Sequence, residues 1–354
     1  MIEVKKVFRV LSIDGGGMRG IYSANFLKTL ACRFGKNGEY DIGKKFDLIV
    51  GTSTGGILAI ALANGITLDK IIELYKSKGK NIFPNPIPKK VSARALKWII
   101  AGKKKRIEGQ TFLKSSLKEI FFNKTLGEMY RIRGIAVCVP TINASTSSLW
   151  VFKTSHIEGK NRDDNYPLVD VCMATSAAPL IFPIYHTKCP DDNVEQFFVD
   201  GGLCMNNPSL LALIEAKEIL RQKNVSASKI QLFSLGTCDT ACGEVISSKN
   251  HNRGICGWLG GVKISNLAMS SQSKTYDSMM RFLCNSTDNV EYIDLKQYQS
   301  VPSSEESKHI SLDGTTDEAV NALLTLSKHD GEKVYSKYLL DKTRQEEIIA
   351  DLFN

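Results

Sequence analysis

Two segments near the N-terminus repeat one pattern: an apolar run, a glycine-rich turn and an apolar helix-like stretch. The first joins Val7–Ile13 to Gly20–Phe34, and the second joins Phe46–Val50 to Gly55–Asn64. A strand, a tight turn and a helix that occur twice in succession predict parallel strands joined by crossover helices. This region therefore constrains the chain to an α/β fold with a mainly parallel central sheet.

The rest of the chain continues the alternation. We expect further strands at Gly134–Val139, Leu149–Thr154, Gln196–Val199, Ile230–Ser234 and Val290–Asp294. We expect further helices at Tyr166–Ala177, Pro208–Gln222, Val262–Leu283, Asp317–Ser327 and Gly331–Phe353.

The region between Pro84 and Arg106 breaks the pattern with three prolines followed by basic residues, which indicates an excursion from the sheet, helical over Ala93–Ala101. We find no internal repeat and no linker. The chain is predicted to be a single domain, 1–354, with a cap or insertion around residues 80–130 and a helical C-terminal region from about residue 254.

The charge balance favours anionic partners. The 354 residues include 46 basic and 37 acidic side chains, a net charge of +9. Such an excess suits phospholipid headgroups or nucleotide phosphates, although a basic surface without a specific partner fits equally well, and we expect no DNA or RNA partner. Nine cysteines without a disulfide or zinc spacing are typical of a reduced, cytoplasmic compartment. We expect no signal peptide and no membrane span, so a lipid would be reached by peripheral contact at the inner membrane surface.

The second glycine turn, Gly51–Gly55, has the pattern G-x-S-x-G between an apolar strand and an apolar helix. A serine in such a sharp turn exposes its hydroxyl above the sheet, and the helix directs its N-terminal dipole at developing negative charge. The same letters also occur in ordinary capped turns. With the flanking strand and helix, the pattern favours Ser53 as a nucleophile.

A serine nucleophile needs a base, and no histidine lies in a recognisable catalytic setting. The chain has His156, His186, His251, His309 and His329, each interpreted as a surface or partly buried side chain. Asp200 instead follows a short apolar strand and precedes Gly201 and Gly202. Partial burial beside the serine would raise the pKa of Asp200 and make it a base. A turn-forming Asp-Gly remains the alternative.

The first glycine turn offers backbone N–H groups. Gly15, Gly16 and Gly17 can form an anion-binding nest for an acyl oxyanion, to which Arg19 would add positive charge. The spacing also satisfies the dinucleotide-binding fingerprint G-x-G-x-x-G. That hypothesis needs an acid at the end of the second strand, where the chain has the serine turn instead.

Four segments together resemble motifs of the patatin-like phospholipases, in the same order. They are Asp14–Gly20, Gly51–Gly55, Ala174–Pro179 and Asp200–Gly202 followed by Asn206–Pro208. The resemblance implies a three-layer α/β/α patatin-like fold with a helical cap. It also implies acyl-ester hydrolysis of glycerolipids by Ser53 and Asp200, an oxyanion loop at Gly15, Gly16, Gly17 and Arg19, and no metal or other catalytic cofactor. A constitutive lipase and a non-catalytic lipid-binding module are the alternatives.

A narrower resemblance is to bacterial phospholipase effectors of the CapV type, which a cyclic dinucleotide switches on in anti-phage defence. It lies in the overall length and in the segment Gly55–Phe83. It implies an activator such as cyclic GMP-AMP, whose binding residues the sequence does not assign. Lys103–Arg106 is a candidate, but a solvated face or headgroup contact is the favoured interpretation.

Two apolar segments beside basic residues predict membrane contact. Trp98, Ile99 and Ile100 precede Lys103–Arg106, a pattern that suits an interface-lying helix, and Trp258-Leu259 could act similarly. Core packing of a cap explains these residues equally well. The sequence does not decide the oligomeric state, and a homodimer is compatible with it.

Overall fold

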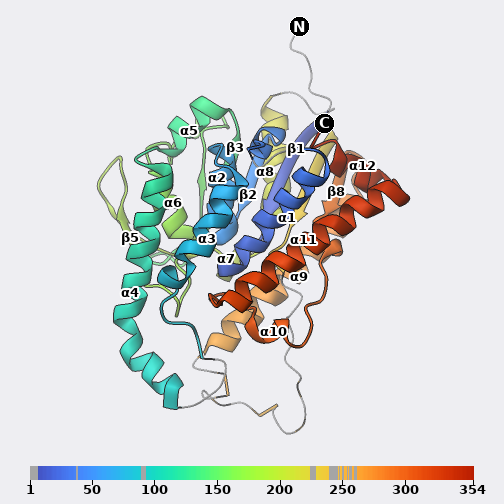
Figure 1. Ribbon diagram of the computed structural model, residues 1–354. Helices are drawn as coiled ribbons and strands as arrows, with labels where there is room; N and C mark the ends of the chain where they lie inside the picture. The colour runs from blue at the N-terminus through green and yellow to red at the C-terminus, as the bar shows by residue number, and fades with distance from the viewer. Residues whose placement is uncertain are drawn as a thin grey trace.

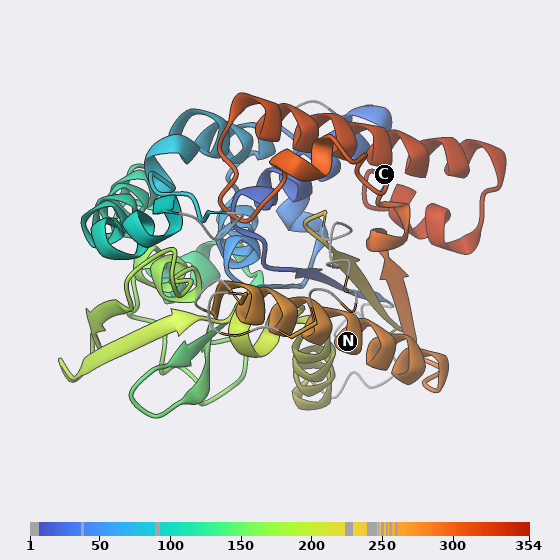
Figure 2. The ribbon, with the colours of Figure 1, turned by 90° about the horizontal axis from the view of Figure 1, so that it is seen from below.

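A central sheet lies between two layers of helices (Figures 1 and 2). The computed structural model describes residues 7–36, 39–88, 93–223, 229–238, 246, 248, 251, 252, 254, 257, 258 and 261–354. Within these residues, eight strands form the sheet in the order β5-β6-β3-β2-β1-β7-β8, with β4 pairing to β3 outside this order. The predicted three-layer α/β/α fold with a mainly parallel sheet is confirmed.

The strands are β1 (Val7–Ile13), β2 (Leu48–Gly51), β3 (Ala136–Asn143), β4 (Ser148–Lys153), β5 (Tyr185–Lys188), β6 (Glu195–Asp200), β7 (Lys229–Leu235) and β8 (Val290–Asp294). The helices are α1 (Gly20–Arg33), α2 (Thr54–Ala63), α3 (Leu68–Ile82), α4 (Ala93–Phe121), α5 (Leu126–Arg133), α6 (Leu168–Thr175), α7 (Gly202–Met205), α8 (Ser209–Gln222), α9 (Val262–Asn285), α10 (Glu306–His309), α11 (Asp317–Leu340) and α12 (Arg344–Ala350).

Successive side chains of the central strands pack alternately into two hydrophobic cores, one on each face of the sheet. Leu11, Ile13 and Ile49 pack in a cluster with α1, α2, α3, α6 and α11, whereas Val10 and Leu48 pack in a second cluster with α8 and the end of α9. Because successive side chains of a strand point to opposite faces, strands buried on both sides read as continuous apolar runs. This explains why the central strands were recognisable from sequence.

The register of β3 brings two strand ends together. β2 runs parallel to the first half of β3, where Val50 pairs with Cys138. β6 runs antiparallel to the second half, where Asp200 pairs with Thr141. The two strands therefore approach one another along β3. Asp200 reaches the end of β2 by this head-to-head arrangement, and its predicted place at the end of a short strand before Gly201 and Gly202 is present.

The C-terminal helices also differ from the prediction. Asp317–Ser327 and the start of Gly331–Phe353 form one helix, α11, which continues through Gly331. A Cβ on Gly331 would lie 2.9 Å from the side chain of Thr29 on α1. The glycine thus permits close packing of α11 on α1, and the helix is continuous where the sequence predicted a break between Ser327 and Gly331.

Five of these strands and helices were not predicted, and one helix is longer than expected. β5, α3, α5, α7 and α10 are additional, and α4 extends to Phe121, well beyond Ala101. Helix α3 had a readable signal, because Leu68, Ile71, Ile72 and Tyr75 follow helical spacing after the N-cap Thr67. In the part of the chain described here, no helix combines the length and apolar character needed to cross a membrane.

Candidate active site

Ser53 lies in a strained turn between β2 and α2. Its backbone has φ 55° and ψ −124°, a conformation that L residues rarely adopt. Glycines make the turn possible, because a Cβ on Gly51 would lie 2.0 Å from the carbonyl oxygen of Gly55, and a Cβ on Gly55 would lie 2.4 Å from that of Ile13. The predicted strand–turn–helix setting of Ser53 is present.

Asp200 accepts the hydroxyl proton of Ser53 in a hydrogen bond. The Ser53 Oγ donates to Asp200 Oδ2 at 2.6 Å, and the backbone N–H of Gly202 donates to Asp200 Oδ1 at 2.7 Å. Asp200 is only 4% exposed. Burial raises its pKa to about 6, although the hydrogen bonds from Ser53 and Gly202 oppose the shift. The carboxylate can therefore act as a base near neutral pH.

Thr175 orients the serine turn, a role that sequence reasoning missed. Its Oγ accepts the backbone N–H of Ser53 at 2.9 Å and donates to the carbonyl of Pro140 at 2.7 Å. Thr175 lies in the motif Ala174–Pro179, but nothing in the motif alone indicated which atom it would contact.

The first glycine loop lies beside Ser53, and its three glycines have different surroundings. The N–H of Gly15 donates to the carbonyl of Asn206 at 2.9 Å, so it is already engaged. Gly16 and Gly17 line the pocket that contains Ser53. Gly17 has φ +57°, and a Cβ there would lie 2.1 Å from the carbonyl oxygen of Leu312. The loop thus offers the pocket the backbone of Gly16 and Gly17.

Arg19 supports this loop from behind. It is 9% exposed, and its Nε donates to the carbonyl of Gly16 at 3.3 Å. It does not belong to the residues that line the pocket. The guanidinium therefore holds the loop backbone, and its role toward an oxyanion stays a prediction.

An apolar pocket opens above Ser53 and Asp200. Its volume is about 660 Å³ with the solvent-open part included, and Thr54, Ser176 and Asn206 are further polar residues of its lining. The apolar lining is Ile57, Leu74, Tyr75, Ile82, Phe83, Leu113, Ala178, Ile181, Phe182, Met269 and Leu312. Helices α2, α3, α4 and α9 contribute to it. Such a lining suits a hydrocarbon chain.

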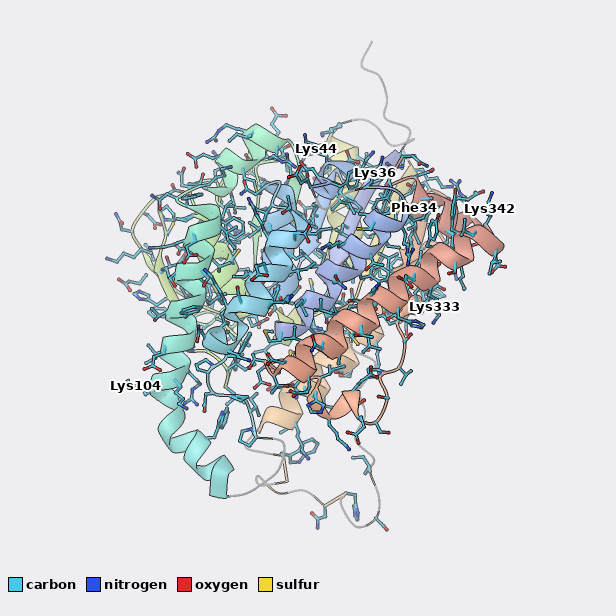
Figure 3. All side chains as sticks on the ribbon, in the orientation of Figure 1. Phe34, Lys36, Lys44, Lys104, Lys333 and Lys342 are labelled. Atoms are coloured by element: carbon cyan, nitrogen blue, oxygen red, sulfur yellow. The ribbon has the colours of Figure 1, made fainter. Side chains whose placement is uncertain are left out.

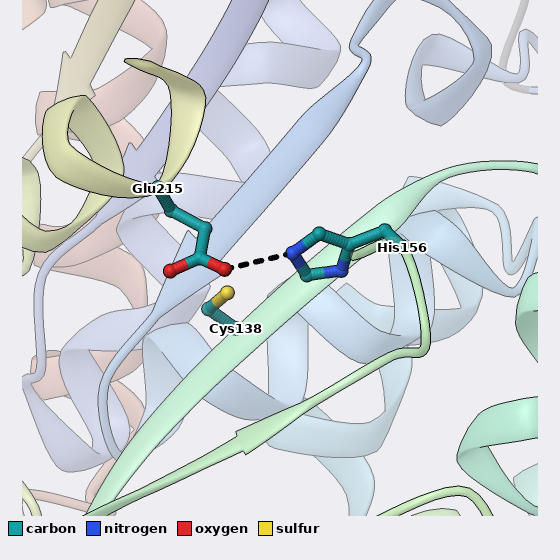
Figure 4. A group of neighbouring side chains, drawn as sticks. All are labelled: Cys138, His156 and Glu215. Carbon is teal, nitrogen blue, oxygen red and sulfur yellow. Dashed lines mark hydrogen bonds and ion pairs between the residues drawn. The ribbon is translucent and has the colours of Figure 1, made fainter. Parts of the chain in front are cut away.

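None of the five histidines, all within the described residues, lines this pocket. Four are exposed, and His156 is buried. His156 Nε2 bonds to Glu215 Oε1 at 2.9 Å and lies near Cys138 (Figure 4). The expectation of a surface or partly buried residue is therefore wrong for His156. The sequence did contain a sign of the acid that pairs with His156: Glu215 interrupts the apolar face of α8.

The cluster of Cys138, His156 and Glu215 has ligand types that bind metals. Its polar atoms are already satisfied, however. Lys153 Nζ donates to Glu215 Oε2 at 2.5 Å, and the Thr154 hydroxyl bonds to His156 Nδ1 at 2.7 Å. Burial raises the pKa of the Cys138 thiol well above its usual value, so it is a poor ligand. These contacts describe a buried ion-pair network.

The predicted membrane segments are only partly described. The Trp98 indole donates to the carbonyl of Asn85 at 3.0 Å, and the Arg106 guanidinium lies 5.6 Å from its ring centroid, so both pack within the α4 region. Lys103, Lys104 and Lys105 are exposed, and Lys104 extends away from the body of the molecule (Figure 3). Trp258 is half-buried, whereas Leu259 and the side chains of Ile99 and Ile100 lie outside the described parts.

The fold and the comparisons define a hydrolase on a three-layer α/β/α scaffold. The chain belongs to the patatin-like phospholipase family, whose model matches residues 11–213. It is 30% identical over 335 residues to a "cGAMP-activated phospholipase" of Escherichia coli, covering 90% of this chain and 87% of that protein. A protein of the same name from Pseudomonas aeruginosa is 30% identical, with 98% and 94% covered.

A third relative carries a different activator in its name. The "cUMP-AMP-activated phospholipase" of Escherichia coli is 29% identical over 224 residues, 61% of each chain. The lipid-hydrolase class predicted from sequence is thereby confirmed, and the narrower resemblance to nucleotide-activated phospholipases extends over most of the chain.

Proposed function

We propose that this protein cleaves fatty-acyl esters of membrane phospholipids with Ser53 as nucleophile and Asp200 as base. The hydrogen bond of 2.6 Å between Ser53 Oγ and Asp200 Oδ2, beneath an apolar pocket, carries the proposal. It places a base with a raised pKa on the hydroxyl of a serine whose backbone is held in a strained turn.

The reaction follows from these contacts. Asp200 takes the proton of the Ser53 hydroxyl as Oγ attacks the acyl carbonyl carbon, and the carbonyl oxygen becomes an oxyanion. The N–H groups of Gly16 and Gly17 and the N-terminus of α2 stabilise that charge. The protonated Asp200 then gives its proton to the leaving alcohol, and an acyl-enzyme remains. A water molecule, deprotonated by Asp200, releases the fatty acid and restores Ser53.

The lining of the pocket supports an acyl chain as the bound group, and no metal or other cofactor is needed for these steps. The enzyme works at the inner membrane surface from the cytoplasm, as one domain in which the cap of residues 80–130 covers the pocket through Leu113. Lys103, Lys104 and Lys105 contact anionic headgroups, because they are exposed together in the first half of α4.

The proposed activator is a cyclic dinucleotide. Two relatives that cover most of the chain are named for cGAMP and another for cUMP-AMP. The net charge of +9 suits a ligand with two phosphates. Its binding residues are not assigned, and a role in antiviral defence follows from the same likeness.

The test is release of fatty acid from vesicles of a fluorescent-acyl phospholipid, with and without cGAMP or cUMP-AMP. Wild type should release acid, and Ser53→Ala should fall to background. Ser116→Ala, which changes another buried serine, on α4, should keep wild-type activity. Equal release by wild type and Ser53→Ala would overturn the catalytic assignment. Equal activity with and without every nucleotide would overturn nucleotide activation and leave the catalytic assignment intact.

The headgroup contact has its own experiment. Changing Lys103, Lys104 and Lys105 to glutamate should weaken sedimentation with anionic vesicles and leave binding to neutral vesicles low. The matched control reverses three exposed lysines that lie far from Lys104 in Figure 3: Lys44, Lys333 and Lys342. If both triple variants lose vesicle binding equally, net charge explains the effect and the proposed contact at Lys103, Lys104 and Lys105 is wrong.

A further inference from the structure

A buried lysine connects the glycine loop to the C-terminal part of the chain. Lys296 follows β8, and its Nζ lies 2.8 Å from Asp14 Oδ2 and 2.9 Å from Asp277 Oδ1. Its side chain is only 13% exposed. Asp14 is the residue immediately before Gly15, whereas Asp277 lies on α9. Lys296 therefore joins the start of the glycine loop to α9.

The charges of this group depend on one another. Burial would lower the pKa of Lys296, but the carboxylates of Asp14 and Asp277 outweigh it and raise the pKa. The ammonium group thus stays charged and neutralises two acids in a nearly dry place. Tyr292 Oη and Asn207 Nδ2 also donate to Asp277 Oδ1, each at 2.9 Å. Without Lys296, the buried carboxylate of Asp14 and the half-buried carboxylate of Asp277 would share one site.

Helix α9 also fixes Asn206, the residue that bonds to Gly15 of the glycine loop. Gln272 Oε1 accepts the N–H of Asn206 at 2.6 Å, and Ser273 Oγ accepts from Asn206 Nδ2 at 2.9 Å. The carbonyl of Asn206 in turn accepts the N–H of Gly15. Asp14 and Gly15 are therefore both fixed to α9, one through Lys296 and one through Asn206. Gly16 and Gly17 follow directly and line the pocket.

We propose that Lys296 is a positioning residue for the oxyanion loop. It holds Asp14 so that the N–H groups of Gly16 and Gly17 meet the oxyanion at hydrogen-bond distance. The inference rests on the proposed catalytic role of Ser53. Lys296 and Asp277 lie beyond residues 11–213, so the C-terminal region contributes to catalysis without touching the substrate.

The experiment compares Lys296→Met, Lys296→Met/Asp277→Asn and Asp277→Asn with wild type, on a soluble p-nitrophenyl ester and with saturating cGAMP. The matched control is Lys153→Met, which removes a lysine from the buried carboxylate of Glu215, away from the loop. Each variant is measured for kcat, KM, the acid limb of the pH profile and thermal unfolding.

Lys296→Met should lower kcat about 10²-fold, comparable to loss of an oxyanion donor, with KM within about threefold. The acid limb should stay near pH 6, since burial and the hydrogen bonds from Ser53 and Gly202 set the pKa of Asp200. The double variant removes the repulsion between the two acids, so it should recover thermal stability and stay slow. Asp277→Asn alone keeps the pair of Lys296 and Asp14 and should lose at most about threefold in kcat. Lys153→Met should lose stability and keep kcat.

Recovery of both kcat and stability in the double variant would reduce Lys296 to a structural role and overturn the proposal. So would equal kcat in Lys296→Met and Lys153→Met. If Lys296→Met does not fold, the double variant is compared with Asp277→Asn. The two differ only at Lys296, so their kcat values measure its effect. A wild type that is inactive, or as active as Ser53→Ala, would instead count against the proposed function.

Discussion

Asp200 and Glu215 are equally buried acids with opposite electrostatic surroundings. Asp200 is 4% exposed and Glu215 is 3% exposed. Among the described residues, Asp200 receives hydrogen bonds from the neutral donors Ser53 and Gly202, and burial raises its pKa to about 6. Burial would also raise the pKa of Glu215, but the hydrogen bonds from His156 and Lys153 outweigh it and lower the pKa. The lysine beside Glu215 thus helps to separate a carboxylate that stays ionised from one suited to take a proton.

The comparison extends to function and stability. A carboxylate that is destabilised when ionised gains from accepting a proton, as a general base must. A carboxylate with a lysine and a histidine holds strand β4 against α8 and has no tendency to accept one. The chain therefore combines the proposed catalytic base and an anchoring acid within one fold.

The largest effect should come from Asp200→Asn. The amide cannot take the Ser53 proton, so kcat should fall about 10³- to 10⁴-fold. Glu215→Gln is the matched change and should leave kcat within about threefold. Steady-state hydrolysis of a soluble ester measures both. A similar loss in the two variants would erase the functional difference between the acids.

For stability, Glu215→Gln should have the larger effect and Asp200→Asn the smaller. Glu215→Gln leaves Lys153 without its carboxylate in a half-buried place, so the free energy of unfolding should fall by about 3 kcal/mol. Asp200→Asn removes an unfavourable buried charge and should hold or raise stability at pH 8. Urea unfolding followed by circular dichroism gives both values. A stable Glu215→Gln variant would contradict the anchoring role.

The pH dependence should also separate the two acids. The pKa of Asp200 is raised from 3.8 to about 6 in the folded state, so the folded state binds more protons between these values. Its contribution to stability is therefore fully present below about pH 4 and is lost as pH rises to 6, by about 2–3 kcal/mol. Activity should move the other way, rising about tenfold per pH unit up to pH 6 and levelling above it.

Glu215 has the opposite sign. Its pKa is lowered on folding, so its stabilisation is present above about pH 4.3 and is lost as pH falls below that value. Unfolding free energies of wild type, Asp200→Asn and Glu215→Gln between about pH 2 and pH 8 test both slopes. Parallel curves for wild type and Asp200→Asn would show that Asp200 titrates normally.

The sequence predicted one of these acids and missed the other for physical reasons. Asp200 follows an apolar strand and precedes glycines, a local pattern that can be read from neighbouring residues. Glu215 and His156 are 59 residues apart, and their contact depends on how α8 packs against the end of β4. The central strands and the serine turn are likewise local signals. The head-to-head approach of β2 and β6 is set by the register on β3, which no local pattern encodes.

The same limit applies to the supporting contacts. The sequence assigned Gly15 and Arg19 to the oxyanion, whereas the structure commits the N–H of Gly15 to Asn206 and places the Arg19 side chain on the carbonyl of Gly16. A glycine-rich loop indicates that N–H groups are available. Which of them face the pocket depends on segments that follow much later in the chain.

The smallest effects should come from two threonines that support the two acids. Thr175 Oγ accepts the N–H of Ser53, and Thr154 Oγ accepts the N–H of Val137 and bonds to His156, all at 2.7–2.9 Å. Both threonines are almost fully buried. Valine has the same shape without the hydroxyl, so each variant should lose about 1–2 kcal/mol of stability.

Only Thr175→Val should also change catalysis. The turn that carries Ser53 has a positive φ, and loss of the bond to its N–H lets the hydroxyl drift from Asp200, lowering kcat about tenfold. Thr154→Val supports only the anchoring cluster and should keep kcat. If the two variants lose stability equally but differ in rate, the difference between the acids extends to the residues around them. Equal kcat values in the two variants would confine the functional difference to Asp200 itself, because the turn would then hold Ser53 without help from Thr175.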